Sequence, residues 1–200
     1  MKNLIVIAFL IIGTSVKAQK DQKVAYFASG CFWCVEAIFE SMEGVNEAVS
    51  GYAGGHTKNP TYKSIGTGRT GHAETVAVYY NPKKVDFATL VIAFFGSHDP
   101  TTVNGQHPDY GTQYRSIAFY NNDEEKDIIE KYIKSLNYKV YKGKVATEVL
   151  PIKKFHEAED YHQNYERLNP NNPYVKNVSI PRLNRFKKRF PTLLKENARH

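Results

Sequence analysis

A single strand-to-helix junction near the N-terminus constrains the fold of this chain more than any other feature. Residues 23–29 (KVAYFAS) are short, β-branched and aromatic, which predicts a strand. Gly30 then turns the chain, and the apolar residues of segment 31–42 (CFWCVEAIFESM) recur at helical spacing. A strand that passes through one glycine into an amphipathic helix is typical of a sheet with helices packed on it.

The rest of the chain repeats this alternation. The patterns predict strands over residues 44–55, 72–81, 113–121 and 145–152, and helices over residues 86–98, 123–136 and 158–168. Asp86 supplies an N-cap, and acidic residues occupy the first turn of the helix that begins at Asp123. Strands that alternate with helices predict an α+β fold whose sheet is covered on one face. The long polar stretches 51–71 and 97–114 are expected to be functional loops.

The first 18 residues have the pattern of a secretory signal peptide. Lys2 gives a positive start, residues 4–12 form an apolar run, and Ala18 stands at a suitable cleavage site. The run is too short to favour a membrane span. We therefore expect an exported, periplasmic protein without stable membrane insertion after cleavage; an uncleaved N-terminal anchor is the alternative.

Positive charge is concentrated at the C-terminal end. The chain has 27 Lys and Arg against 20 Asp and Glu, and residues 176–200 hold eight of these basic residues but only one Glu. The preceding residues 19–175, which we predict to form a single domain, show no basic stripe, so nucleic-acid binding is not expected.

The basic tail itself has a helical pattern. Leu183, Phe186 and Phe190 are spaced as one apolar side of a helix that Pro181 can start and Pro191 can stop. We predict a short helix docked by this side, with five basic side chains largely in water: Arg182, Arg185, Lys187, Lys188 and Arg189. A surface for an anionic partner is the alternative.

The only two cysteines, Cys31 and Cys34, lie one helical turn apart. Unpaired amide groups and the helix dipole favour an anion at Cys31, which predicts a lowered thiol pKa and a nucleophile with Cys34 as its partner. A static disulfide is the alternative, although it would close almost no loop and stabilise little. A zinc site is disfavoured because no second cysteine pair exists. Phe32 and Trp33 would form an apolar wall beside the nucleophile.

Five blocks of this sequence resemble the A class of the peptide-methionine sulfoxide reductases. The stretch Gly30-Cys31-Phe32-Trp33 resembles the active-site signature of that family. The other blocks agree in order and spacing: GYAGGHTKNPTY at 51–62, TGHAETVAVYYNP at 70–82, SHDPTTVNGQHPDYGTQYRS at 97–116 and FHEAEDYHQNY at 155–165. The resemblance covers roughly residues 24–173. It implies a two-layer α/β plait, a mixed sheet with helices packed on it.

The resemblance also implies a reaction. Cys31 would attack the sulfur of an S-epimer methionine sulfoxide, free or in a protein, while Glu74 delivers a proton to the oxygen. The Cys31 sulfenic acid would then be resolved by Cys34, as in the subgroup with Gly-Cys-Phe-Trp-Cys. A thioredoxin-like dithiol reductant would reset the disulfide. No dissociable cofactor and no metal is implied, and the enzyme is expected to act as a monomer.

The family's remaining site residues map onto the loops and the cysteine turn. Tyr62 and Tyr114 would hydrogen-bond the sulfoxide oxygen, Asp109 would orient the site or the substrate backbone, and Phe32 and Trp33 would hold the substrate methyl group. Neither His72 nor His162 receives a role from sequence. Two other functions stay open at this point: an exported thiol–disulfide oxidoreductase, which would not need Glu74, and a secreted binding module with a structural disulfide.

Overall fold

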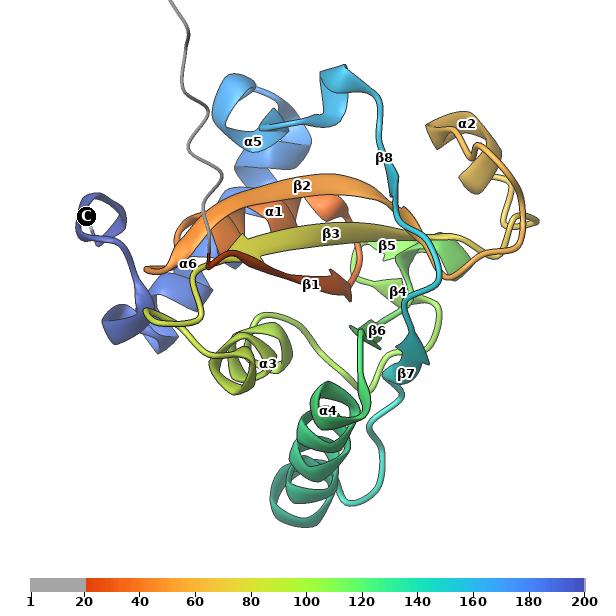
Figure 1. Ribbon diagram of the computed structural model, residues 1–200. Coiled ribbons are helices and arrows are strands. Elements are labelled where there is room, and N and C mark those ends of the chain that lie inside the picture. Colours follow the sequence, from red (N-terminus) through yellow and green to blue (C-terminus); the bar gives the residue numbers. More distant parts are fainter. Residues whose placement is uncertain (1–20, 200) are drawn as a thin grey trace, which may run out of the picture.

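A six-stranded mixed sheet forms the centre of the computed structural model, which describes residues 21–199 (Figure 1). The strand order is β7-β6-β1-β3-β2-β8, and every neighbouring pair is antiparallel except β6 and β7. The strands are β1 (Lys23–Ala28), β2 (Val45–Ala53), β3 (Ala73–Tyr80), β6 (Ile117–Tyr120), β7 (Glu148–Pro151) and β8 (His156–Glu157). A separate two-stranded ribbon pairs β4 (Gly105–Gln106) with β5 (Asp109–Tyr110). The predicted signal peptide, residues 1–18, lies outside the described residues.

The helices are α1 (Phe32–Glu40), α2 (Tyr62–Ile65), α3 (Phe87–Gly96), α4 (Asp123–Leu136), α5 (Tyr165–Leu168) and α6 (Ile180–Arg189). The Asp86 carboxylate accepts the Thr89 N–H at 2.7 Å, which confirms the predicted N-cap of α3. The predicted helix over residues 158–168 is wrong: a 3₁₀ turn (Asp160–His162) and the short α5 stand there. Asn164 separates them because its positive φ of 54° interrupts a right-handed helix.

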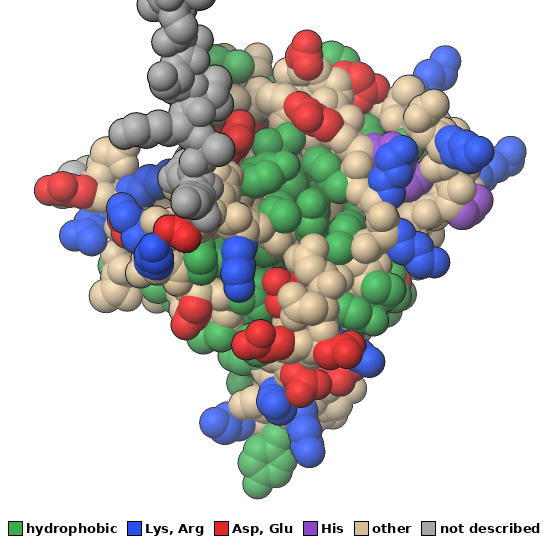
Figure 2. All heavy atoms as spheres, in the orientation of Figure 1, with side chains coloured by type: hydrophobic (Ala, Val, Ile, Leu, Met, Phe, Trp, Pro, Cys, Tyr) green, Lys and Arg blue, Asp and Glu red, His purple; other side chains and the backbone are tan. Residues whose placement is uncertain are grey.

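The main core lies between one face of the sheet and the helices. Phe27 of β1 stacks on Phe39 of α1 and on Phe94 of α3, with ring centroids 5.2 and 4.9 Å apart. In Figure 1, α1 and α6 lie behind the sheet, while the chain between β7 and β8 crosses in front of it. Figure 2 shows hydrophobic side chains across the centre of that front face. The predicted fold, a mixed sheet with helices packed on it, is confirmed.

The C-terminal helix α6 docks on this core, but the prediction for Arg182 is wrong. Phe186 is fully buried, as the apolar spacing predicted, yet Arg182 is also buried, with 9% of its surface exposed. The two residues are four apart and therefore share one helix face, so docking Phe186 also buries Arg182. Arg185, Lys188 and Arg189 are exposed as predicted. Within residues 21–199, no helix is long and apolar enough to cross a membrane.

Candidate active site

The junction between β1 and α1 places both thiols at the start of the helix. Gly30 adopts a positive φ of 81°, and a Cβ at this position would lie 2.7 Å from the Gln106 Cβ, so the turn needs glycine. Cys31 is the N-cap residue of α1, and Cys34 lies one turn inside. Both are free and buried, with 8% and 1% of their surfaces exposed.

Glu74, at the beginning of β3, lies against this helix start. Its carboxyl accepts the Phe32 backbone N–H at 2.9 Å, and only 2% of the residue is exposed. Burial raises the Glu74 pKa to about 8, although the Phe32 N–H partly opposes this shift. The side chain is therefore mostly protonated near neutral pH and can donate a proton.

The pKa order of the two thiols differs from the sequence prediction. Burial raises the pKa of Cys31 well above its usual value, and the hydrogen bond to Cys34 and the neighbouring Glu74 raise it further. A hydrogen bond from Cys31 lowers the pKa of Cys34 to about 7. The prediction of a lowered Cys31 pKa is thus wrong, and the resting pair keeps its proton on Cys31.

The two predicted phenols come from different loops and meet at Glu74. Tyr62 opens α2, and Tyr114 ends the 3₁₀ turn Thr112–Tyr114. Burial and the neighbouring Glu74 raise the pKa of Tyr62 to about 12, and the same two causes raise that of Tyr114 further. Both side chains therefore stay neutral hydrogen-bond donors at working pH, beside the acid and near Cys31.

Asp109 completes the predicted set from a third direction. It lies half-buried on β5, and the Tyr174 hydroxyl donates to its carboxylate. Burial raises the Asp109 pKa, and its charge is one of the influences that raise the pKa of Glu74. The structure thus brings Asp109 into the same site as the thiols and the phenols.

Phe32 and Trp33 form an aromatic wall, but they contribute differently. Phe32 is buried and packs against the rings of His162 and Tyr62, with centroids 4.9 and 6.2 Å away. Trp33 is half-buried, stacks on Tyr165 at 3.8 Å, and donates its indole N–H to Nδ1 of His162 at 3.2 Å. Phe32 therefore forms the buried part of this aromatic surface, and Trp33 forms the part that solvent can reach.

Three residues that support this site have no role in the sequence analysis. Tyr174 holds Asp109, and His162 holds the Trp33 ring. Glu159 binds both the Tyr62 backbone N–H, at 3.0 Å, and the Tyr52 hydroxyl, at 2.7 Å, and so ties the Tyr62 loop to the sheet. A second buried carboxyl, Glu36 of α1, accepts from the Ser50 hydroxyl and from the Asn164 backbone N–H, outside this set of contacts. Only the abundance of tyrosine and the aromatic-rich stretch near His162 hinted at any of them.

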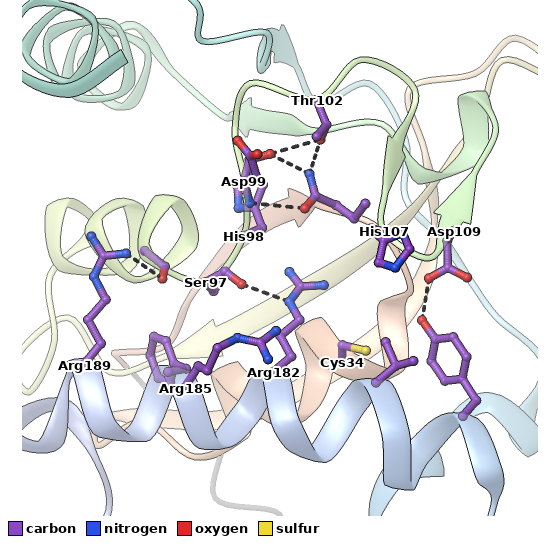
Figure 3. A pocket seen from close by; sticks show the side chains of 15 residues that line it. Cys34, Ser97, His98, Asp99, Thr102, His107, Asp109, Arg182, Arg185 and Arg189 are labelled. Atoms are coloured by element: carbon purple, nitrogen blue, oxygen red, sulfur yellow. Dashed lines mark hydrogen bonds between the residues drawn. The ribbon is translucent and has the colours of Figure 1, made fainter.

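A cavity of about 460 Å³ lies between Cys34 and the helix α6 (Figure 3). Its walls are the segment that follows α3, the β4–β5 ribbon and one face of α6. Cys34, Asp109, Tyr174 and Arg182 are among the residues that line it. Cys31 is not among them, so the two thiols face different surroundings.

This geometry defines a class of enzyme. A thiol that attacks a substrate cannot expel a bound oxygen efficiently unless an acid protonates that oxygen, and a buried neutral carboxyl beside Cys31 provides such an acid. A second thiol one turn away can then close a disulfide. The fold and site are those of a thiol-dependent oxidoreductase with an acid-assisted reduction step.

Comparison with known proteins gives the family. Residues 23–194 match the model of the family described as peptide methionine sulfoxide reductase. Peptide methionine sulfoxide reductase MsrA 1 of Rhodopirellula baltica is 46% identical over 184 residues, which cover 92% of this chain and 95% of the relative. The reduced form of Mxr1 from Saccharomyces cerevisiae has a TM-score of 0.72 and 37% identity, and the match covers 76% of this chain and 88% of Mxr1.

A second yeast structure, Mxr1 in complex with Trx2, has a TM-score of 0.53 and 27% identity, and the match covers 76% of this chain and 91% of that one. The chain belongs to the peptide methionine sulfoxide reductase family, in its MsrA branch. It is therefore an oxidoreductase that reduces methionine sulfoxide through cysteine chemistry.

Proposed function

We propose that Cys31 reduces S-epimer methionine sulfoxide, free or in proteins, and that Cys34 resolves the product. The observation that carries this assignment is the buried Glu74 carboxyl, which is held on the Phe32 N–H beside Cys31 and is neutral near pH 7. Tyr62 and Tyr114 stand beside the same carboxyl as neutral donors for the substrate oxygen.

In the first step, Cys31 attacks the sulfoxide sulfur. The Cys31 thiol loses its proton to solvent as it attacks. Glu74 gives its proton to the oxygen, and methionine leaves as Cys31 becomes a sulfenic acid. In the second step, Cys34 forms the Cys31–Cys34 disulfide and water is released.

A dithiol reductant is needed to restore the two thiols. The complex of Mxr1 with Trx2 supports a thioredoxin-like protein in this role. Cys34 lines the cavity beside α6, so a reductant that opens the disulfide at Cys34 would act from that side.

The test is a thiol count on the reduced protein after mixing with a methionine sulfoxide peptide. We expect two thiols lost for each methionine formed and no metal requirement. Thiol loss without methionine formation would contradict the proposal. The alternative, exchange with protein disulfides, does not explain a buried proton donor, and Glu74→Gln should separate the two because disulfide exchange would survive it.

We also propose that residues 1–18 direct export to the periplasm and that the mature enzyme is a monomer. The charged start, the apolar run and Ala18 support the first statement. Expression of the full chain in a bacterium, followed by fractionation and N-terminal sequencing, should give a periplasmic product that begins at Gln19. Light scattering should give the mass of one chain.

A further inference from the structure

An arginine from the C-terminal helix lies beside the thiol pair without a carboxylate partner. The Arg182 guanidinium donates to the Ser97 carbonyl at 2.9 Å, the Ser29 carbonyl at 3.0 Å and the Ser29 hydroxyl at 3.1 Å. All three acceptors are neutral. Among residues 21–199, no Asp or Glu forms an ion pair with it.

Burying such a cation carries a large free-energy cost. Removing a charge from water costs several kcal/mol, and neutral acceptors recover only part of that cost. A nearby group that becomes negative during the reaction would offset the rest of this desolvation cost. The buried arginine therefore points to an anion that exists in one state of the enzyme.

The cavity beside α6 contains a suitable group. Arg182 and Cys34 both line it, and Figure 3 shows the guanidinium and the Cys34 sulfur on the same side of the helix. The other nearby anion, Asp109, already accepts from the Tyr174 hydroxyl. Ser179, three residues before Arg182, also lies near Cys34 and helps to lower its pKa, and its hydroxyl donates to the Glu166 carboxylate. The turn that ends at Ser179 and the first turn of α6 thus both lie beside the second thiol.

We propose that Arg182 is a positioning residue that stabilises the Cys34 thiolate, and thereby sets how fast Cys34 resolves the Cys31 sulfenic acid. In this step the Cys34 thiolate attacks the Cys31 sulfur, the S–S bond forms and the S–O bond breaks. The departing hydroxide takes one proton from solvent and leaves as water, so no further reductant is consumed. The inference rests on the proposed function of the two cysteines.

Several groups face Cys34 and must be weighed together. Cys31 donates the hydrogen bond that lowers the Cys34 pKa most, and Arg182 lowers it further through its charge. Burial and Glu166 of α5 oppose them. Glu74 and Tyr174 also lie close enough to interact with Cys34. Once Cys31 is a sulfenic acid, the hydrogen bond from its thiol to Cys34 is gone. The positive charge of Arg182 then still favours the Cys34 thiolate.

The experiment measures two steps, methionine release and disulfide closure, during a single turnover of the reduced enzyme. Methionine release reports the attack by Cys31, and the lifetime of the sulfenic acid, measured by trapping, reports closure of the disulfide. For Arg182→Gln we expect unchanged methionine release, closure slowed about tenfold at pH 7, and a closure midpoint raised by about one pH unit, since one unit of thiol pKa changes the thiolate fraction tenfold. Arg182→Lys, which keeps the charge, should stay within about threefold of the parent.

Lys188→Gln is the matched control, because it removes one positive charge from an exposed position of the same helix. Its closure rate and midpoint should equal those of the parent. Unchanged closure in Arg182→Gln, or an equal loss of methionine release and closure, would overturn the inference. If Arg182→Gln does not fold, Arg182→Lys decides: a kept midpoint supports the charge role, and a midpoint one unit higher refutes it. Failure of the proposed function would instead appear as no methionine release from the parent.

Discussion

Replacement of Glu74 by Gln should lower activity and raise stability at the same time. The amide keeps the shape of the side chain and an oxygen that can accept the Phe32 N–H. It cannot transfer a proton to the substrate oxygen. It also removes the cost of holding an ionisable carboxyl in a buried site.

The two effects can be sized from the structure. A positioned general acid contributes about 10²–10⁴-fold, or roughly 3–5 kcal/mol of barrier, so the single-turnover rate should fall by that factor. The Glu74 pKa rises from its ordinary value of 4.5 to about 8 on folding. Between these values the unfolded chain is ionised and the folded chain is not, so stability falls with pH by about 1.4 kcal/mol per unit. Near pH 7 this amounts to roughly 3 kcal/mol.

Denaturant unfolding at pH 5, 7 and 8.5, alongside single-turnover methionine release, checks both effects. Glu74→Gln should gain stability over the parent as pH rises and should lose the rate at every pH. The parent rate should decline above pH 8, where Glu74 loses its proton.

Glu36→Gln is the control, since burial raises the pKa of Glu36 to about 7 while its contacts, Ser50 and Asn164, lie away from the thiols. It should show a similar pH-dependent gain in stability without the loss of rate. A Glu74→Gln variant with the parent's rate near neutral pH would remove Glu74 from the mechanism. A variant whose stability follows the parent at all three pH values would show that the carboxyl is not neutral in the fold.

Four further substitutions test the division of roles and the docking of the tail. Cys31→Ser should abolish methionine formation, because a serine hydroxyl without an activating base is too weak a nucleophile. Cys34→Ser should form about one equivalent of methionine and then stall as a trappable sulfenic acid; full turnover with thioredoxin would refute its resolving role. Tyr114→Phe should lower the rate by up to about 10²–10³-fold, with little change in unfolding free energy. Phe186→Ala should lower the unfolding free energy by about 3–5 kcal/mol; an unchanged midpoint would mean that α6 does not brace the core.

The sequence predicted the residues of the candidate site better than the residues that support them. Cys31, Glu74 and Tyr62 lie in short sequence motifs that could be read directly from the chain. The structure brings these three residues together. Asp109 and Tyr114 follow from the same blocks. The order of the thiol pKa values could not be predicted, because it depends on how deeply each thiol is buried and on the hydrogen bond between them. Glu74 adds to the Cys31 shift from forty-three residues further along the chain.

The C-terminal segment shows a different limit. Helical spacing correctly indicated that Phe186 would be buried, but a charged residue on the same face was assigned to water by its type alone. Only the packing of α6 against Ser29 and Ser97 shows that acceptors for Arg182 are available there. Tyr174 and Glu159 were missed for a similar reason: each is tied to a partner far away in sequence and carries no local pattern.

The distance along the chain between the thiols and the groups that surround them affects how the enzyme matures. Cys31 and Cys34 leave the ribosome early, whereas Tyr174 and Arg182 are synthesised well after both cysteines. A nascent chain therefore presents both thiols before the helix that lies beside them has been made. Any oxidant or mispairing partner encountered in that interval meets them before the fold can shield them. Chains that stop before α6 would lack this cover permanently.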